Sequence, residues 1–158
     1  MKATPVNLPL PWGTLEGLHW SRPGAPKVLC LHGWLDNAAS FAPLAAFLTD
    51  FDLLALDFAG HGFSSHRPAT SRYYFADNLF DVDLALTHMG CDRCVVIGHS
   101  MGAGVAICLA AALPELVEQL VLLDSIGVYT LASDLASRQL RSSIMSVRKN
   151  RSFLRPYE

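Results

Sequence analysis

Short apolar runs alternate with segments typical of helices along most of this 158-residue sequence. The runs that are typical of strands cover residues 15–20, 27–31, 52–56, 94–97 and 117–123. The segments that are typical of helices cover residues 40–48, 75–89, 101–113 and 131–147. Strands that alternate with helices pair in parallel, because each helix returns the chain to the end where the next strand starts. The sequence therefore predicts an α/β protein with a mostly parallel sheet and helices on both faces.

The ends of two predicted helices carry residues that suit those positions. Ser40 can serve as the N-cap of the helix over 40–48. Gly90 follows the helix over 75–89, where a left-handed backbone suits glycine. We therefore expect the first helix to begin at Ser40 and the second to end just before Gly90.

The composition supports this fold and excludes several classes of protein. Hydrophobic residues make up 51% of the chain and charged residues 16%, as expected when strands are covered on both sides. The net charge of -2 gives no reason to expect a nucleic-acid partner. The longest apolar run, 101–113, is too short to span a membrane, and residues 1–13 do not resemble a signal peptide. We expect a cytoplasmic protein without a membrane span.

The four cysteines predict no metal site and no cofactor. Cys30 and Cys108 lie inside apolar runs, as buried thiols do. Cys91 and Cys94 form a Cys-x-x-Cys motif, but it leads into a predicted strand, whereas redox motifs of this kind begin a helix. A zinc site would require two further ligands nearby, and the sequence offers none there. The motif therefore gives no reason to expect redox or metal chemistry.

Ser100 lies at the centre of the motif Gly98-His-Ser-Met-Gly102, between a predicted strand and a predicted helix. A sharp turn at this point raises the serine side chain above the sheet, and the two glycines allow the turn to close. A serine hydroxyl needs a base to become a nucleophile, and its reaction needs donors for the developing oxyanion. The backbone N–H of Met101 is placed to be one such donor, so the motif predicts a nucleophilic serine.

A second loop, His32-Gly33-Trp34, ends the predicted strand over 27–31. An oxyanion hole takes its second N–H from a loop after an earlier strand. We predict that the N–H of Trp34 fills this role, although the loop also suits a simple turn.

Four motifs resemble the α/β-hydrolase family, and most closely its serine hydrolase-like branch. They are LHGWLDNAASF (31–41), LDFAGHGFSSH (56–66), VVIGHSMGAG (95–104) and LVLLDS (120–125). The resemblance covers roughly residues 5–130. It implies an eight-stranded, mostly parallel sheet with Ser100 as nucleophile and the N–H groups of Trp34 and Met101 as oxyanion donors. A serine at this position, where other branches carry aspartate, points to esters, thioesters or related acyl substrates.

The histidine of the triad is the part of the pattern that the sequence does not supply. In this fold the triad follows the order serine, acid, histidine. All six histidines precede Ser100, and the 158 - 100 = 58 residues after it contain none. We interpret residues 1–129 as the N-terminal part of an α/β-hydrolase core and residues 130–158 as the truncated start of a lid. A fragment, a shortened protein and a natural short form all fit this interpretation.

Asp124 is the candidate for the triad acid. It ends the predicted strand over 117–123, where some branches of the fold carry the acid, while more carry it one strand later. A helix N-cap or a loop position is the alternative. Asp57 also ends a strand, but its Asp-Phe-Ala-Gly-His-Gly setting indicates a residue that organises a turn.

Two classes of function remain open: a serine hydrolase acting on a small acyl substrate, and a non-catalytic α/β-hydrolase-like protein that binds a ligand or is an inactive short form. If the chain ends as given, the strand over 117–123 has an unpaired apolar edge, which favours self-association.

Overall fold

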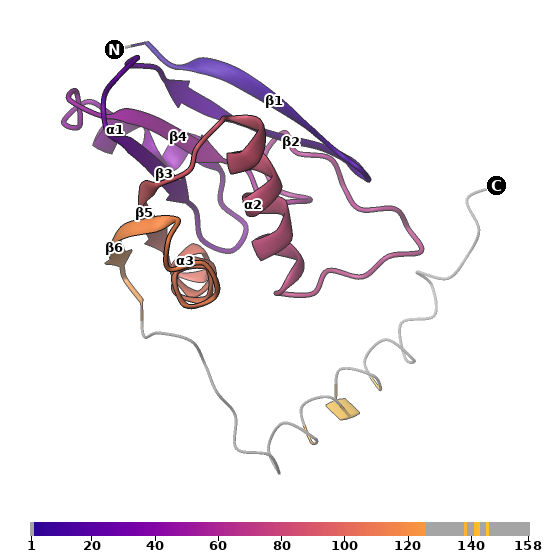
Figure 1. The fold of residues 1–158 in the computed structure, drawn as a ribbon. Helices are drawn as coiled ribbons and strands as arrows, with labels where there is room; N and C mark the ends of the chain where they lie inside the picture. The colour runs from indigo at the N-terminus through magenta and orange to yellow at the C-terminus, as the bar shows by residue number, and fades with distance from the viewer. Residues whose placement is uncertain (1, 126–137, 139–140, 143–144, 146–158) are drawn as a thin grey trace. The chain divides into compact units, whose positions relative to one another are not determined.

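A six-stranded sheet runs through the computed structural model, which describes residues 2–125 together with residues 138, 141, 142 and 145. The strands are β1 (Thr4–Leu10), β2 (Gly13–Trp20), β3 (Lys27–Leu31), β4 (Asp52–Leu56), β5 (Cys94–His99) and β6 (Val117–Leu123). Their order across the sheet is β1-β2-β4-β3-β5-β6 (Figure 1). The last four in this order are parallel, whereas β1 and β2 are antiparallel to their neighbours. The prediction of a mostly parallel α/β sheet is confirmed.

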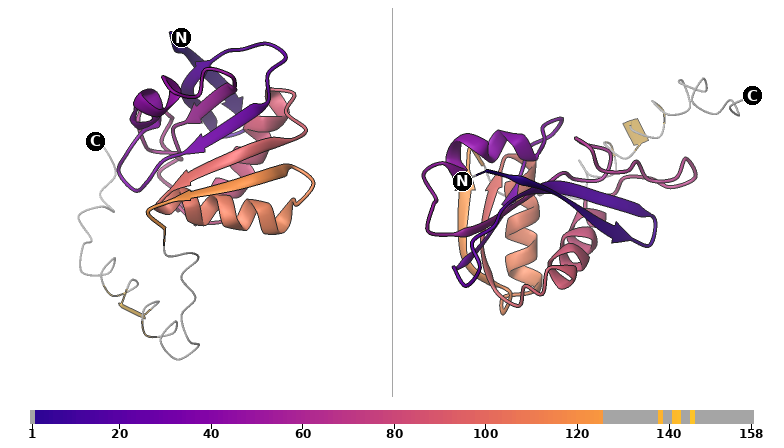
Figure 2. Two further views of the ribbon diagram at one scale, coloured as in Figure 1. Left: turned by 90° about the vertical axis from the view of Figure 1, so that its left-hand side faces the viewer. Right: turned by 90° about the horizontal axis from the view of Figure 1, so that it is seen from above.

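Helices cover both faces of the sheet. The 3-10 turn η1 (Ala38–Phe41) and α1 (Ala42–Ala45) pack on one face, and α2 (Asp77–His88) and α3 (Met101–Ala112) pack on the other. Figure 2 shows the sheet between α1 on one side and α2 and α3 on the other. Each face therefore has its own hydrophobic core.

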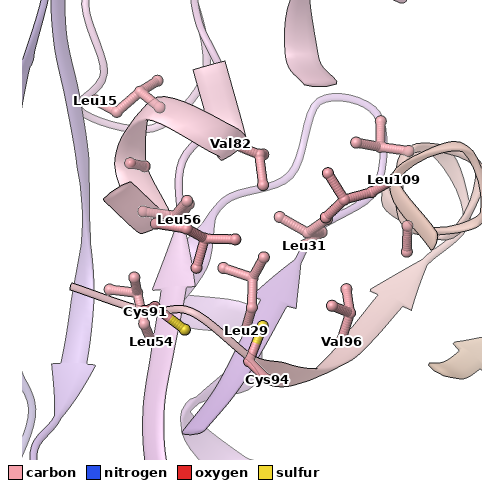
Figure 3. Close-up of a cluster of buried hydrophobic side chains, with 14 of the residues drawn as sticks. Leu15, Leu29, Leu31, Leu54, Leu56, Val82, Cys91, Cys94, Val96 and Leu109 are labelled. Carbon is pink, nitrogen blue, oxygen red and sulfur yellow. The ribbon is translucent and has the colours of Figure 1, made fainter. Parts of the chain in front are cut away.

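Strand β3 shows why the central strands are apolar at every position. Leu29 and Leu31 point into the core beneath α2 and α3 (Figure 3), whereas Val28 and Cys30 point into the core beneath α1. All four side chains are at most 3% exposed. Because successive side chains of a strand alternate between the faces, a strand covered on both sides must be apolar throughout.

Strand β1 was not predicted, because Pro5 and Pro9 lie within it. Proline lacks the N–H that a central strand uses in its hydrogen-bond ladder, so it argues against a strand in a sequence pattern. β1 pairs only with β2 among the described residues, and an edge strand tolerates this loss. Its position at the edge of the sheet is a tertiary property that the local sequence does not reveal.

The helix predicted over 40–48 with Ser40 as its N-cap was wrong in its start and its length. Asn37 is the N-cap of η1, and its side-chain oxygen accepts a hydrogen bond from the N–H of Ala39 at 3.0 Å. The hydroxyl of Ser40 instead donates to the carboxylate of Asp36. Asparagine at this position satisfies one of the free N–H groups of the first turn, so the helical segment begins before Ser40.

The second predicted helix ends as expected. Gly90 adopts a φ of 57° just after α2, the left-handed conformation of a C′ residue. The helix predicted over 131–147 lies outside the described residues, except that Arg138, Arg141, Ser142 and Met145 are helical and exposed. The chain divides into two units, Met1–Val128 and Tyr129–Glu158, and the sheet belongs to the first.

Candidate active site

The four parallel strands end in four loops at one edge of the sheet. His32, Asp57, Ser100 and Asp124 directly follow β3, β4, β5 and β6. The connection after β3 leads to one face of the sheet and the connection after β5 leads to the other, so the two loops diverge. In open α/β sheets this divergence opens a crevice at the carboxyl ends of the strands, where ligands bind. The loops after β3 and β5 form this crevice here.

Ser100 adopts a strained backbone between β5 and α3. Its φ is 49° and its ψ is -110°, a backbone conformation that residues other than glycine rarely adopt. Its N–H donates to the carbonyl of Leu123 at 3.1 Å, and its own carbonyl accepts from the N–H of Ala103 at 3.1 Å. These bonds hold the turn against β6 and α3, while the residue itself stays exposed. This is the geometry of a serine raised above the sheet by a strand-to-helix turn.

The two glycines of the motif are required by close packing. A Cβ added to Gly98 would lie 2.5 Å from the Cα of Ala103. A Cβ added to Gly102 would lie 2.2 Å from the carbonyl oxygen of Leu31. Both contacts involve backbone atoms that cannot rotate away. Gly98 therefore allows α3 to lie close to β5, and Gly102 allows it to lie close to the end of β3. Together they fix the position of Ser100.

The loop after β3 lies directly against Ser100. A Cβ added to Gly33 would lie 3.4 Å from the Cβ of Ser100 and 2.9 Å from Nδ1 of His99. Among the residues that the structure describes, neither the N–H of Trp34 nor that of Met101 has a hydrogen-bond acceptor. Met101 is also the first residue of α3, where the helix dipole favours negative charge. Two free N–H groups thus flank the serine from two loops.

His32 supports this loop from within the core and is not a base for Ser100. The ring is fully buried, Nδ1 donates to the carbonyl of Gly33 at 2.7 Å, and Nε2 accepts from the N–H of Phe58 at 3.0 Å. Burial lowers the pKa of His32 from its usual 6.5, so the neutral ring is favoured. Both nitrogens are occupied, and the side chain ties the loop after β3 to the loop after β4.

Asp57 organises the turn after β4, as its sequence setting predicts. Its carboxylate accepts hydrogen bonds from the N–H groups of Ala38 at 2.6 Å and Phe63 at 2.8 Å. A Cβ on Gly62, whose φ is 51°, would lie 2.0 Å from this carboxylate. Asp57 is 3% exposed, so its role in the described structure is to link three segments of backbone.

Four of the five remaining histidines bond to other partners, and the fifth, His99, places Nδ1 against Gly33. His19 pairs with Asp52 at 2.8 Å at the opposite end of β4, and His88 contacts the carbonyl of Leu84 on α2. His61 bonds to the carbonyl of Ala59, and His66 to the hydroxyl of Tyr73. Within the described part of the chain, no histidine forms a hydrogen bond with the hydroxyl of Ser100.

Asp124 follows β6 beside the serine. Its φ is 46°, and the residue before it, Leu123, accepts the hydrogen bond from the N–H of Ser100. The side chain is exposed. Ser100 and Asp124 therefore lie on neighbouring strand ends, and each is a non-glycine residue with a positive φ.

A cleft of about 300 Å³ adjoins the two N–H groups. Its walls include the side chains of four aromatic residues together with Met101, Arg67 and His61; the aromatic residues are Trp34, Tyr73, Tyr74 and Phe75. The contribution of residues 73–75 was not predicted from the sequence. The signal that could have revealed it is a run of three aromatic residues in an otherwise polar loop after a strand that ends at the site.

Arg67 is held at the wall of this cleft by neighbours on α2 and the β1–β2 turn. Its guanidinium pairs with the carboxylate of Asp81 and lies 4.5 Å from the centre of the Trp12 ring. Trp12 in turn donates to Asp81 at 2.9 Å. The charge of Arg67 is therefore largely compensated before any ligand binds, and the cleft is chiefly an aromatic surface.

Comparison with known proteins gives one consistent result. Residues 26–147 match the family model described as alpha/beta hydrolase fold. The serine hydrolase-like protein of Danio rerio is 44% identical over 126 residues, which are 79% of this chain and 39% of that protein. This chain thus spans about two-fifths of the length of that relative.

Solved structures agree with the sequence comparison. A hypothetical protein of Pseudomonas aeruginosa PAO1 superposes with a TM-score of 0.84 at 40% identity, covering 93% of this chain and 53% of that one. The thioesterase domain from the curacin biosynthetic pathway superposes with a TM-score of 0.76 at 26% identity, covering 91% and 51% respectively. In both cases the likeness extends over about half of the other chain.

Proposed function

The chain belongs to the α/β hydrolase fold family, and we propose that within this fold Ser100 is the nucleophile of a serine hydrolase that acts on an ester, thioester or related acyl substrate. The observation that carries the proposal is the exposed Ser100, held in a strained turn near the N–H groups of Trp34 and Met101, neither of which has an acceptor among the described residues. The thioesterase named above and the serine hydrolase-like relative support acyl transfer as the chemistry.

The proposed reaction begins when Oγ of Ser100 attacks the acyl carbon. The N–H groups of Trp34 and Met101 then stabilise the oxyanion of the tetrahedral intermediate. The intermediate collapses to an acyl-serine, and the proton taken from the serine leaves with the alcohol or thiol. Water then hydrolyses the acyl-serine and restores the hydroxyl. The aromatic cleft beside Met101 is suited to a flat or apolar part of the substrate.

Proton removal is the step that the described residues do not supply. In this fold it belongs to a histidine that follows the serine and the acid in the chain. We propose Asp124 as the acid, because it ends β6 beside the backbone of Ser100 and its side chain is exposed at the same edge. Such a carboxylate holds the histidine in the orientation and tautomer that accept the serine proton.

Acetylation by p-nitrophenyl acetate tests the role of Ser100 in the 158-residue chain. We expect slow acetylation that free imidazole accelerates, because imidazole supplies the missing base while the oxyanion hole remains. Mass spectrometry of peptides should place the acetyl group on Ser100. Ser100→Ala should remove this product, whereas Ser71→Ala, at an exposed loop serine, should leave it unchanged. Acetylation of Ser100 no faster than that of Ser71 would contradict the proposal.

A second candidate function is ligand binding without turnover. The observation that favours it is that no histidine of the described chain is hydrogen-bonded to the hydroxyl of Ser100, while the aromatic cleft is already formed. In that case imidazole should produce no acyl-serine, and p-nitrophenyl acetate should not modify Ser100 even at high concentration.

We also propose a cytoplasmic location and a small acyl substrate as the binding partner. The four cysteines are free thiols, as expected in a reducing compartment. Within the part of the chain that the structure describes, no helix has the length and apolar character needed to cross a membrane.

A further inference from the structure

Cys91 and Cys94 meet at the end of the sheet opposite Ser100. Cys91 follows the C-terminus of α2, and Cys94 is the first residue of β5. The backbone N–H of Cys91 donates to Leu86 at 2.9 Å, and that of Cys94 donates to Leu116 at 2.9 Å, so both residues are anchored. A register shift in the pairing of β5 with β6 falls at Cys94, and irregularities of this kind redirect a side chain.

The two thiols lie side by side and line the same cavity. Figure 3 shows their sulfur atoms on the same side of the sheet, next to Leu29 and Leu54. The sulfur of Cys91 also lies 3.6 Å from the carbonyl oxygen of Arg93 within the same turn. The pair is therefore assembled in the reduced protein, with no rearrangement of secondary structure required to bring it together.

The surroundings distinguish the two cysteines chemically. The neighbouring thiol of Cys94 and, to a smaller extent, the ammonium of Lys27 lower the pKa of Cys91 to about 7, against the effect of burial. The neighbouring sulfur of Cys91, together with burial, raises the pKa of Cys94. The ammonium of Lys27 is held beside the pair because it donates to the carbonyl of Gly90 at 2.7 Å. Loss of a proton is therefore favoured at Cys91 over Cys94.

The site has room for a small oxidant. Cys91 is 7% exposed and Cys94 is 2% exposed. Both line a cavity of about 30 Å³ that Lys27 also borders. This volume accommodates a molecule on the scale of one water, and hydrogen peroxide is only slightly larger.

We propose that Cys91 and Cys94 form a reversible redox site, in which hydrogen peroxide oxidises the adjacent dithiol to an intramolecular disulfide. The thiolate of Cys91 attacks one peroxide oxygen, the O–O bond breaks, and the products are a sulfenic acid on Cys91 and hydroxide. The sulfur of Cys94 then attacks the sulfur of Cys91, a new S–S bond forms, and the S–O bond breaks. The thiol proton of Cys94 and the hydroxyl of the sulfenic acid leave as water. Two electrons pass from the two thiols to peroxide, and an external thiol reverses the change.

The other two cysteines lack this arrangement. Cys30 is fully buried beneath α1, and burial raises its pKa to about 12. Cys108 lies half-buried on α3, with no second cysteine beside it in the described chain. The redox site is also remote from Ser100, because β5 separates them by six residues, about 20 Å at the rise of a strand. The site therefore does not rest on the proposed hydrolase function.

The test exploits Arg93, which lies between the two cysteines. The chain carrying Cys108→Ser is treated with hydrogen peroxide, alkylated, unfolded and digested with trypsin, which cuts after Arg93. We expect the peptides that contain Cys91 and Cys94 to remain joined, with a mass two hydrogens lower, until dithiothreitol separates them. The rate should rise with pH through a midpoint near 7, as the thiolate of Cys91 forms.

Charged groups near the pair set this midpoint. They are Lys27 on β3, Asp92 in the turn, Glu118 on β6, and the pair of His19 and Asp52 across the cavity. Lys27→Gln should move the midpoint to higher pH, whereas Arg72→Gln, in an exposed loop, should leave it unchanged.

Two further variants decide the outcome. In a chain that also carries Cys94→Ser, dimedone added as the oxidised protein is unfolded should trap the sulfenic acid on Cys91, since no second thiol resolves it. Ser100→Ala should oxidise at the wild-type rate. Separate peptides after peroxide treatment, or oxidation of Cys91 no faster than that of Cys30, would overturn the proposal. Circular dichroism of each variant confirms that the comparison is between folded proteins.

Discussion

His32 shows at the scale of one residue how a site can be built on a side chain that takes no part in the chemistry. Its two ring nitrogens bond to the backbone of Gly33 and Phe58. Gly33 lies against Ser100, so the ring transmits the position of one loop to another. A protonated ring could not accept the hydrogen bond from Phe58, and the site therefore depends on a neutral histidine.

Stability should consequently fall in mild acid because of His32. Burial lowers its pKa in the folded protein below 6.5, so the unfolded chain binds the proton first as the pH decreases. The stabilisation is present above pH 6.5 and is lost below it, by at most about 1.4 kcal/mol per pH unit. Urea unfolding at several pH values between 7.5 and 5 measures this slope.

The control for this prediction is an exposed histidine. His32→Gln should flatten the dependence of the unfolding free energy on pH, even if the variant is less stable at every pH. His88→Gln, on the surface of α2, should keep the slope. A His32→Gln variant with the wild-type slope would show that other groups cause the loss of stability in acid.

At the scale of elements, α3 and β3 approach each other so closely that no Cβ fits at the point of contact. The helix carries Gly102, Ala103, Gly104 and Ala106 on its buried surface. Small residues there allow the first turn of α3 to lie against the end of β3, which brings the N–H of Met101 and the loop around Gly33 to the same serine. The contact between these two elements is thus what assembles the oxyanion hole that we propose.

Gly102→Ala should destabilise the protein, whereas Gly104→Ala should not. The added Cβ at position 102 would lie 2.2 Å from the carbonyl oxygen of Leu31, and overpacking of this kind costs about 1–3 kcal/mol. At position 104 the nearest atom is the ring end of Phe75 at 3.3 Å, which can shift, and alanine stabilises a helix by up to about 1 kcal/mol relative to glycine. Thermal and urea unfolding of both variants provides the measurement, and equal losses would show that α3 can move away from β3.

At the scale of the whole molecule, the sheet has one edge that differs from the other. β1 closes one edge with two prolines, which discourage further pairing. β6 forms the other edge of the described sheet, and its apolar residues are unusually exposed: Leu120 at 36%, Val121 at 40%, Leu122 at 41% and Leu123 at 38%. We propose that the 158-residue chain self-associates through this strand.

Light scattering during size-exclusion chromatography should therefore show a mass that increases with concentration. Val121→Lys should shift the chain toward the monomer, because a charged edge resists pairing with another strand. Phe63→Lys, in the exposed loop after β4, removes an apolar side chain elsewhere and should leave the association unchanged. A wild-type chain that is monomeric at all concentrations would exclude this edge as an interface.

The strands and the serine turn were predictable because their causes are local. Apolar runs such as 27–31 and 52–56 must be buried wherever they lie, and the glycines around Ser100 suit a sharp turn whatever packs against it. By contrast, β1 was missed because its prolines argue against a strand unless it lies at an edge. The N-cap was placed at Ser40 and not Asn37, because both residues suit that position and the packing of the segment determines which is used.

The redox pair and the aromatic cleft depend on contacts between distant parts of the chain. The Cys-x-x-Cys motif is visible in the sequence, but the lysine beside it comes from β3, more than sixty residues earlier. Residues 73–75 lie in the connection from β4 to α2, and the tertiary structure brings this connection to the cleft beside Met101. Local sterics and periodicity thus determine which elements form and where the serine turn lies. The pairing order of the strands determines which loops meet. This order depends on the whole chain, because both faces of the sheet must be covered by other parts of the chain.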